Sequence, residues 1–329
     1  QQLFVWVAQQ YGLESKLVAK DAIAQARLRW WFRGELSEEV PAIDNDKPLV
    51  VVLDHAGGDR PGDAYLLNQL CAVAEQKHQQ CLVGLAYWGD ATVDALEKLR
   101  TQANNLTAVV MLQDFVMGGG EGRERANEQL ALLNVPVLKA IKLRDRTAAQ
   151  WQLSSDGLAV EKVYYQISMP EMQGASQPLV VASAGAVTED VQTGIRIQPI
   201  EPVLEGMETL MDRVQRWHSL QTQPNAEKRI AIVYYNHPPG RHNIGADNLD
   251  VPATLWQILN QMKSAGYRVS DLPASQNALL DAMQESGVNL PNDHAALVKM
   301  SHSVMRMDAT QYQSYFDTLP EVVKREMVD

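Results

Sequence analysis

The segment from residue 236 to residue 250 holds the densest group of chemically active side chains in the sequence. Its imidazoles, guanidinium, amides and carboxylates suit an anionic ligand that has ring nitrogens or carboxylates, or a metal ion. The pattern alone assigns neither a catalytic residue nor a metal ligand, because two histidines five residues apart on a loop do not define a metal site. The candidate ligand-binding residues are Asn236, His237, Arg241, His242, Asn243 and Asp247.

Within this segment His237 and His242 are candidate catalytic residues, and these two together with Asp247 are candidate metal ligands. The segment follows an apolar run at 229–235 and precedes a helical pattern, and ligands bind at such positions in open α/β sheets. A Pro-Pro pair stiffens it, and its glycines permit close backbone approach. The alternative interpretation is a solvated surface loop built from polar turn residues.

A second candidate lies at 54–62, after the apolar run Leu49–Leu53. His55 and Arg60 are its candidate ligand-binding residues, and its position favours a cleft. A plain glycine-rich turn between a strand and a helix is the interpretation that we favour for this segment.

A third candidate is the glycine-rich run 118–123, where backbone amides could hold an anion at the start of a helix. Glu121 weakens this idea, since its own carboxylate can occupy such a site. Neither this run nor the 236–250 segment has the order of a Walker loop or of GxGxxG.

The elements that must position these residues alternate regularly between short apolar runs and amphipathic patterns. Continuous β-branched runs of this length indicate buried parallel strands, and repeated βα units imply a parallel sheet with helices on both faces. The sequence therefore predicts an α/β fold, doubly wound and flavodoxin- or Rossmann-like. The expected strands are 49–53, 81–86, 107–112 and 135–140, and the expected helices are 63–77, 91–102 and 123–133.

The chain divides into two expected domains at a polar breaker, 222–225, which follows a helical pattern at 202–220. Domain 1–225 begins with a helical segment, 1–46, that includes an amphipathic helix over 13–33. Residues 151–200 are less regular, and we expect strands and loops there, with apolar strings at 163–167, 179–182 and 195–197.

Domain 226–329 is expected to be a second α/β domain that carries the 236–250 segment. Its expected strands are 229–235 and 267–269, and its expected helices are 251–265, 274–286 and parts of 292–329. Asp250 and Gly266 suit the start and the end of the helix 251–265. Two strands are few for a sheet, so we expect this domain to be truncated.

Composition argues against several classes of protein. A net charge of −11 argues against a nucleic-acid binder. Two cysteines without a CxxC pair argue against a disulfide framework and a cysteine zinc site, although a single bridge stays open. No apolar run approaches the roughly 20 residues of a membrane helix. We expect a cytoplasmic protein, but both ends resemble segment boundaries, so a periplasmic or membrane-anchored parent stays open.

The region 228–269 resembles the most specific block of the CobN/magnesium-chelatase H family. That block has a strand, a PPGKGNIG-like loop, an LDVP helix start and a GYxV strand, and this chain has KRIAIVYYNHPPGRHNIGADNLDVPATLWQILNQMKSAGYRV. The segments 135–140 (VPVLKA) and 169–174 (MPEMQG) are similar to the family's GVPVLQA and PELDG, and 312–328 resembles the stretch ahead of its WG motif. The similarity covers roughly residues 105–329.

The resemblance implies the large subunit of a class I chelatase, in which a corrinoid or porphyrin and a divalent metal are the substrates. Co²⁺ is the first choice of metal, and Mg²⁺ and Fe²⁺ are the others. It implies two partner subunits, an AAA+ ATPase and an integrin-I-like subunit, with ATP bound there and not on this chain. The 236–247 loop would then line the tetrapyrrole cleft, with Arg241 on a ring carboxylate and His237 or His242 assisting metal delivery or pyrrole deprotonation.

Two alternatives stay open at this point. Position 242 is His where the family pattern commonly has Gly, and Asp247-Asn248 is more acidic than usual, which leaves room for a relative that removes or carries metal or tetrapyrrole, such as a haem dechelatase. The other alternative is a two-lobed protein that binds a small ligand between its domains without catalysis.

Overall fold

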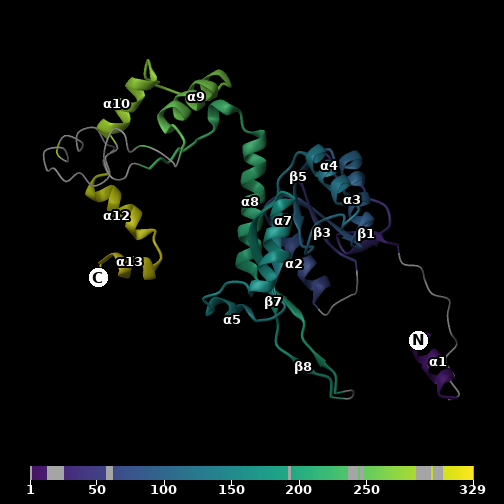
Figure 1. Ribbon diagram of the computed structural model, residues 1–329. Coiled ribbons are helices and arrows are strands. Elements are labelled where there is room, and N and C mark those ends of the chain that lie inside the picture. The colour runs from purple at the N-terminus through teal and green to yellow at the C-terminus, as the bar shows by residue number, and fades with distance from the viewer. Residues whose placement is uncertain are drawn as a thin grey trace. The chain divides into compact units, whose positions relative to one another are not determined.

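A computed structural model describes residues 2–12, 26–56, 62–191, 194–235, 244, 248–286, 298 and 307–328 (Figure 1). The chain forms two compact units, 1–222 and 223–329, called unit 1 and unit 2 below. No helix of the described residues is long and apolar enough to cross a membrane.

Unit 1 is built on an eight-stranded sheet with the order β10-β7-β6-β5-β3-β4-β1-β2. The strands β4, β3, β5, β6 and β7 are parallel, and their order along the sheet is the flavodoxin-like 2-1-3-4-5 order. The doubly wound prediction is therefore confirmed. The parallel strands are β3 (Leu49–His55), β4 (Gln80–Ala86), β5 (Leu106–Met111), β6 (Val137–Lys142) and β7 (Ala175–Ala184); the antiparallel ones are β1 (Leu28–Phe32), β2 (Glu35–Ser37) and β10 (Ile200–Pro202).

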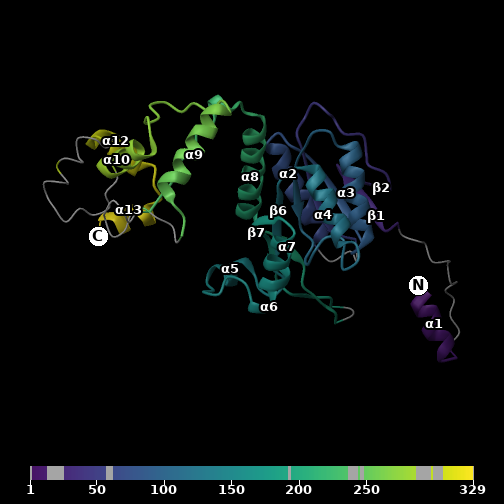
Figure 2. The same cartoon turned by 45° about the horizontal axis from the view of Figure 1, so that its top comes forward.

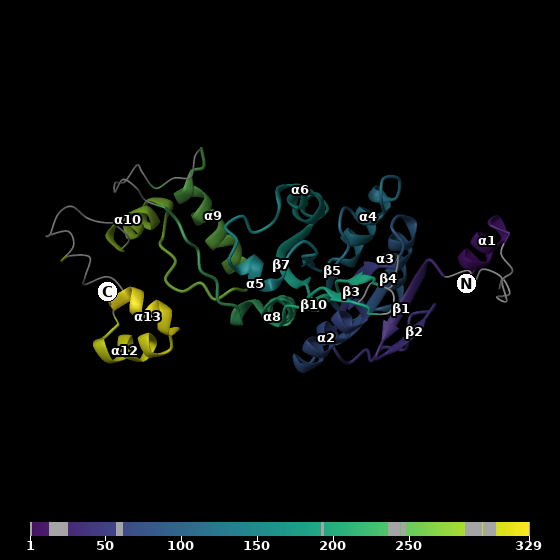
Figure 3. The same cartoon turned by 90° about the horizontal axis from the view of Figure 1, so that it is seen from below.

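Each face of the sheet is covered by helices, because alternate residues of a strand point to opposite faces. Val50 and Val52 pack with α2 (Asp63–Gln76) and α8 (Leu204–Thr222) in one core. Val51 and Leu53 pack in a second core with α3 (Asp90–Gln102) and α4 (Arg123–Leu133). Figure 3 shows the two pairs of helices on opposite sides of the strands, and Figure 2 shows α3 beside α4.

The helix expected over 13–33 is wrong in its last part, where residues 28–32 form β1; residues 13–25 lie outside the described residues. β1 pairs antiparallel with β4 and buries Trp30 completely in the second core. Aromatic side chains fit a strand as readily as a helix, so tertiary burial decided the outcome. Ahead of it, α1 (Gln2–Gln10) is helical as expected.

The strand expected at 163–167 is also wrong, because this stretch is helical. α6 (Val160–Val163), a π-helical turn (Tyr164–Ser168) and α7 (Met169–Met172) run on without a break. A short apolar run does not distinguish a strand from a helix, which is the physical reason for the error. The other irregular elements of the region are α5 (Ala148–Gln152) and the hairpin β8 (Thr188–Glu189) and β9 (Arg196–Ile197), which extends from unit 1 in Figure 1.

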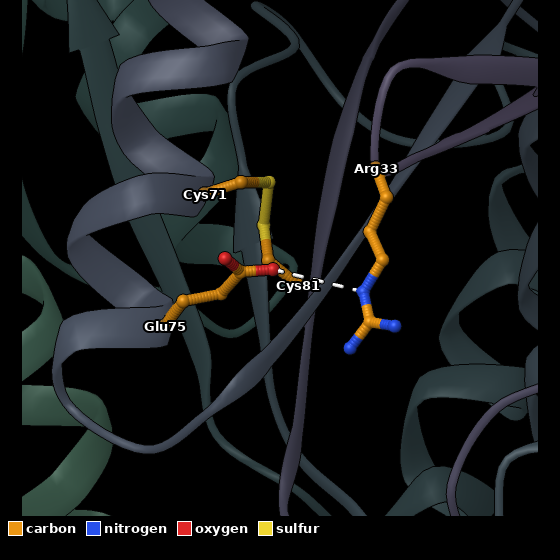
Figure 4. The surroundings of a disulfide bond; sticks show 4 residues. All are labelled: Arg33, Cys71, Glu75 and Cys81. Atoms are coloured by element: carbon orange, nitrogen blue, oxygen red, sulfur yellow. Dashed lines mark ion pairs between the residues drawn. A yellow bond between two sulfur atoms is a disulfide. The ribbon is translucent and has the colours of Figure 1, made fainter.

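A disulfide joins Cys71 on α2 to Cys81 on β4, across the first core (Figure 4). Both cysteines are buried, and their Cα atoms are 5.2 Å apart. Glu75, one helical turn after Cys71, faces Arg33 across a 4.0 Å ion pair at the surface. The single bridge that the sequence left open is thus formed, and it ties a covering helix to the sheet.

In the described residues of unit 2, two helices, α9 and α10, form a small core of Val251, Leu255, Leu279 and Met283 together with Ile244. Asp250 caps α9 by accepting a 3.0 Å hydrogen bond from the Ala253 amide, as expected. Gly266 adopts a positive φ of 83° directly after that helix ends. The helices are α9 (Val251–Ser264), α10 (Gln276–Ser286), α12 (Ala309–Asp317) and α13 (Glu321–Val328), with a 3₁₀ turn at Asn225–Glu227.

The strands expected at 229–235 and 267–269 are not formed, since neither segment takes part in a ladder. Strand pairing needs a neighbour in register, and the described residues of unit 2 supply none for these two segments. The expected α/β character is therefore confirmed for unit 1, while the regular elements in the described part of unit 2 are helices.

Candidate functional site

Unit 1 has a cleft of about 760 Å³ at the carboxyl ends of its parallel strands. The chain passes from β3 to β4 on one side of β3 and then to β5 on the other side of β3. The connection after β3 and the one leading on from β5 therefore run in opposite directions along the sheet. Ligands of open α/β folds bind at such a topological switch point. We call this hollow the switch-point cleft. It is lined by His55, Asp63, Tyr87, Trp88, Leu112, Asp114, Phe115, Val116, Gly119, Gly120, Arg123, Lys142, Arg144 and Met169.

A buried ion pair lies at the base of the cleft. The Lys142 ammonium at the end of β6 donates to both carboxylate oxygens of Asp54 at the end of β3, at 2.7 and 2.6 Å. Both side chains are almost fully buried, and β5 lies between their strands, so the lysine reaches across the end of β5. A buried charge needs a partner of opposite charge, so this ion pair fixes the positions of both side chains.

A second lysine lies close by in the same strand. Lys139 is 1% exposed, its Nζ donates to the Gln113 carbonyl at 2.7 Å, and it lies 3.5 Å from the Asp114 carboxylate. Burial lowers the pKa of Lys139 to about 8, although Asp114 acts in the opposite direction. Gln166 also donates to Asp114, at 3.3 Å. The carboxylate of Asp114 is thus held at the cleft wall by two donors.

His55 stands at the mouth of the cleft with an exposed side chain. Desolvation by the surrounding protein lowers its pKa, and the nearby Asp54 and Asp114 offset part of that effect. A lowered pKa disfavours the imidazolium form, and the neutral ring can accept a hydrogen bond at one of its nitrogens.

Four aromatic rings lie in a row that begins at the cleft, where Trp88 and Phe115 are lining residues. The ring centroids of Trp88 and Phe115 are 6.5 Å apart, those of Phe115 and Tyr165 are 4.5 Å apart, and those of Tyr165 and Tyr164 are 5.3 Å apart. Phe115 has a positive φ of 66°, and its amide donates to the Tyr165 carbonyl at 2.9 Å. These four rings remain partly exposed, and the planes of successive rings are inclined to one another by 61°, 47° and 71°.

The segment 118–122, which contains four glycines, shapes the wall of the cleft beside Trp88. Gly118 has a φ of 84°, and a Cβ there would lie 2.4 Å from the Gly122 carbonyl. Gly119 has a φ of 66° and packs against Trp88. Only glycine fits this tight turn, which brings backbone and Arg123 to the cleft.

Comparison with known proteins gives one family. The family model described as CobN/Magnesium Chelatase matches residues 6–329. The chain belongs to the CobN/magnesium chelatase family. The magnesium-chelatase subunit ChlH of Oryza sativa subsp. indica is 31% identical over 216 residues, which are 64% of this chain and 14% of that protein. The aerobic cobaltochelatase subunit CobN of Sinorhizobium sp is 28% identical over 208 residues, which are 63% of this chain and 16% of that protein.

A solved relative shares the fold of this family member. The catalytic subunit of cobaltochelatase from Mycobacterium tuberculosis superposes with a TM-score of 0.62 at 22% identity, covering 97% of this chain and 25% of that one. The chain spans between 14% and 16% of the length of the two curated relatives. Cobalt and magnesium chelatases resemble this family member almost equally, so sequence identity does not choose between the metals.

The predicted site residues of this CobN/magnesium chelatase chain fall into two groups, those that line the switch-point cleft and those that lie outside the described residues. His55 lines the switch-point cleft, and the third candidate contributes Gly119, Gly120 and Arg123 to the lining. Glu121 is not among the lining residues. The remaining candidates, Arg60, Asn236, His237, Arg241, His242, Asn243 and Asp247, lie outside the described residues.

Sequence analysis missed the two lysines of the family member's β6 and their carboxylate partners. A signal was present, because Lys139 and Lys142 interrupt an otherwise apolar strand in which every residue is buried. A lysine in such a strand requires a buried partner. In the described ranges, no group of three or more histidine, cysteine, aspartate or glutamate side chains is arranged to hold a metal ion.

Proposed function

We propose that this chain is part of the large subunit of an ATP-dependent chelatase, which holds a corrinoid or porphyrin while a divalent metal is inserted. Family membership over residues 6–329 carries the proposal. The aromatic and cationic lining of the cleft in unit 1 supports it, because a flat macrocycle with acidic side chains needs both kinds of contact.

Insertion replaces two ring N–H protons by M²⁺, so the site must hold the ring, deliver the metal and accept two protons. In the proposal the loop 236–247 forms part of the wall around the macrocycle. Arg241 pairs with a ring carboxylate, and His237 or His242 takes a pyrrole proton or passes on the metal, with Asp247 as a further metal ligand. A neutral imidazole suits either role, since its free nitrogen is both a base and a ligand.

Co²⁺ is the metal that we place first, and Mg²⁺ and Fe²⁺ are the alternatives. ATP is bound by partner subunits, an AAA+ ATPase and an integrin-I-like subunit, which drive the reaction. The sequence of this chain has neither a Walker loop nor GxGxxG, in keeping with a nucleotide site elsewhere.

The proposal is tested on the full-length parent with its partner subunits. A metal-free porphyrin or a metal-free corrinoid acid is mixed with Co²⁺, Mg²⁺ or Fe²⁺, with and without ATP, and metallation is followed by absorbance. We expect ATP-dependent insertion with Co²⁺ and a loss of tenfold or more in the variant His237→Ala/Arg241→Ala. The matched control is His218→Ala, a helical residue of α8 in unit 1.

Two outcomes would contradict the proposal. If no ring and metal pair is converted while haem loses its iron, the parent is a dechelatase. If wild-type rates persist in the His237→Ala/Arg241→Ala variant, the role given to the loop is wrong.

A further inference from the structure

A second hollow of unit 1 lies between the start of β7 and the C-terminal half of α8. Its volume is about 690 Å³. It shares no lining residue with the switch-point cleft, and the proposed function gives it no role. We call it the α8 groove, and it is lined by Gln177, Pro178, Arg213, Arg216, Trp217 and Leu220.

Helix α8 contributes four of these residues from a single face. They are three or four positions apart, so their side chains lie next to one another along the helix. Trp217 packs only partly against the first core, and Leu220 is 46% exposed. The end of α8 therefore carries apolar surface that the sheet does not cover. The residues of α8 that are fully buried in that core are Met207, Leu210, Met211 and Val214.

A β-bulge in β7 shapes the other wall of the groove. Ser176 and Leu179 are separated by two residues, but their partners on β6 are separated by only one, so β7 has an extra residue here. Gln177 has a positive φ of 54° in this bulge, a strained conformation for a residue other than glycine. Its carbonyl accepts a 2.9 Å hydrogen bond from the guanidinium of Arg213. The bulge therefore holds this guanidinium in place at the groove.

The two guanidiniums of the groove have no acidic partner among the residues that the structure describes. In those ranges no carboxylate forms an ion pair with Arg213 or Arg216, and the lining includes no acidic side chain. Asp212, the nearest carboxylate in the sequence, is paired with Lys77 at 2.6 Å. Guanidiniums bind carboxylates through charge-assisted hydrogen bonds. In a protein of net charge −11, this cationic groove suits an acidic ligand.

The composition and exposure of the groove indicate a protein partner. Tryptophan and arginine are the residue types that most often dominate the binding energy of protein interfaces. A small-molecule pocket encloses most of its ligand, whereas Pro178, Arg216 and Leu220 are exposed here. An added strand does not fit at this edge, because Pro178 has no amide N–H and the bulge breaks the register of the ladder. The partner must therefore bind through its side chains.

We propose that the α8 groove docks an acidic amphipathic segment of a partner protein. Two carboxylates of the segment, one helical turn apart, pair with Arg213 and Arg216, and an apolar side chain between them packs on Trp217 and Leu220. The spacing of the carboxylates follows from the two arginines, which lie three residues apart on one helix face. The inference does not rest on the proposed function, because no residue of the groove lines the switch-point cleft or belongs to the 228–269 block.

The test uses the full chain 1–329 and fluorescein-labelled peptides, with binding followed by fluorescence anisotropy. The probe is a peptide of about 14 residues that has glutamates one helical turn apart around a central phenylalanine. Arg213→Gln/Arg216→Gln is expected to raise Kd about tenfold, because charge-assisted hydrogen bonds to carboxylate are lost. Leu220→Asn is expected to raise Kd about threefold through lost apolar contact. Arg213→Glu/Arg216→Glu is expected to prefer a peptide that has lysines in place of the glutamates.

Matched controls separate binding from general damage. Arg125→Gln removes an exposed arginine from α4, and Gln215→Ala changes an exposed residue of α8 outside the groove; both are expected to leave Kd unchanged. A peptide with glutamines in place of the glutamates is expected to bind wild type about tenfold more weakly. Arg216→Gln alone keeps the hydrogen bond between Arg213 and Gln177 and is still expected to weaken binding. Circular dichroism melting checks that every variant is folded.

The inference is overturned if wild type does not bind the glutamate peptide, or if Arg213→Gln/Arg216→Gln binds it as tightly as wild type. A phosphoserine version that binds about tenfold more tightly than the glutamate peptide, with the same arginine dependence, would identify a phosphopeptide site instead. Displacement of the peptide by octanoate at a similar concentration would identify a site for a small amphiphile. Failure of the proposed function looks different, because arginine-dependent peptide binding would persist while the full parent inserts no metal.

Discussion

Unit 1 and unit 2 respond differently to the same kind of sequence pattern. In unit 1 the apolar runs at 49–53, 81–86, 107–112 and 135–140 each found a neighbour, and five parallel strands formed one sheet with a core on each face. In unit 2 the run 229–235 has equally strong strand character, but no described segment pairs with it. Helices make their hydrogen bonds locally, whereas strands depend on partners, so unit 2 retains its helices and not its strands.

The contrast extends to buried charge. Unit 1 buries Lys139 and Lys142 on β6 and Asp54 on β3, and each of these charged groups has a hydrogen-bond partner there. The small core of unit 2 consists of apolar side chains and the phenol of Tyr234, whose hydroxyl donates to the Met283 carbonyl at 3.2 Å. Unit 1 therefore has a polar site that its own fold positions, and each prediction below tests that difference.

The largest effect is expected from breaking the buried ion pair. Lys142→Met leaves Asp54 buried and unpaired, which should lower the free energy of unfolding of unit 1 by about 3–5 kcal/mol. Hydrogen exchange should speed up in β3, β5 and β6 and stay unchanged in α9 of unit 2. The double variant Asp54→Leu/Lys142→Met should regain most of the loss, since it removes both charges.

The control for that prediction is Lys98→Met, which breaks an exposed pair with Glu39 and should change stability by no more than about 1 kcal/mol. Equal losses in the free energy of unfolding for Lys98→Met and Lys142→Met would show that burial of the Asp54–Lys142 pair does not affect stability.

A smaller effect is expected from pH, with opposite signs in the two units. Lys139 has a pKa of about 8 when folded and 10.5 when unfolded, so the unfolded chain binds more protons between these values. Unit 1 should therefore gain up to about 3 kcal/mol as pH rises from 8 to 10.5. Burial raises the pKa of Tyr234, so unit 2 should lose stability as pH rises through 10.

Urea unfolding at several pH values between 8 and 11 checks this, with Lys139→Met and Tyr234→Phe as the matched variants. Lys139→Met should remove the rise in the free energy of unfolding of unit 1 with pH. Tyr234→Phe should remove the fall in the free energy of unfolding of unit 2 with pH. The assignment fails if either variant keeps the wild-type slope.

The smallest effect is expected at the start of α9. Asp250→Ala removes the side chain that accepts from the Ala253 amide and should destabilise unit 2 by about 1 kcal/mol. Gln257→Ala, an exposed position on the same helix, serves as the control and should change stability little. A thermal melt of unit 2 that is insensitive to Asp250→Ala would mean that the cap does not stabilise α9.

Much of unit 1 could be predicted from the sequence, because its strands are continuous apolar runs of the right length. The run 49–53 and the helix 123–133 were placed within two residues of their actual bounds. Segment 28–32 could not be predicted, since its strand character depends on the burial of Trp30 against β4. Pairing across the sheet is a long-range property that a local pattern does not contain.

The site was predicted only in part, for a similar reason. His55 and the run 118–123 were found because they follow strands, and position in a parallel sheet is a local signal. The pair of Asp54 and Lys142 joins residues 88 positions apart in the sequence and was missed. The lysines in the buried strand β6 were visible, but their partners became apparent only from the fold.

The most direct test of the cleft in unit 1 is a photo-oxidation footprint. The chain is mixed with deuteroporphyrin IX and illuminated briefly with azide present to quench diffusing singlet oxygen, and oxidised residues are identified by mass spectrometry. A ring bound in the cleft should oxidise Trp88 and Met169 well above Trp6 and Trp217. Trp88 and Met169 oxidised no more than Trp6 and Trp217 would contradict a role for the cleft in holding the ring.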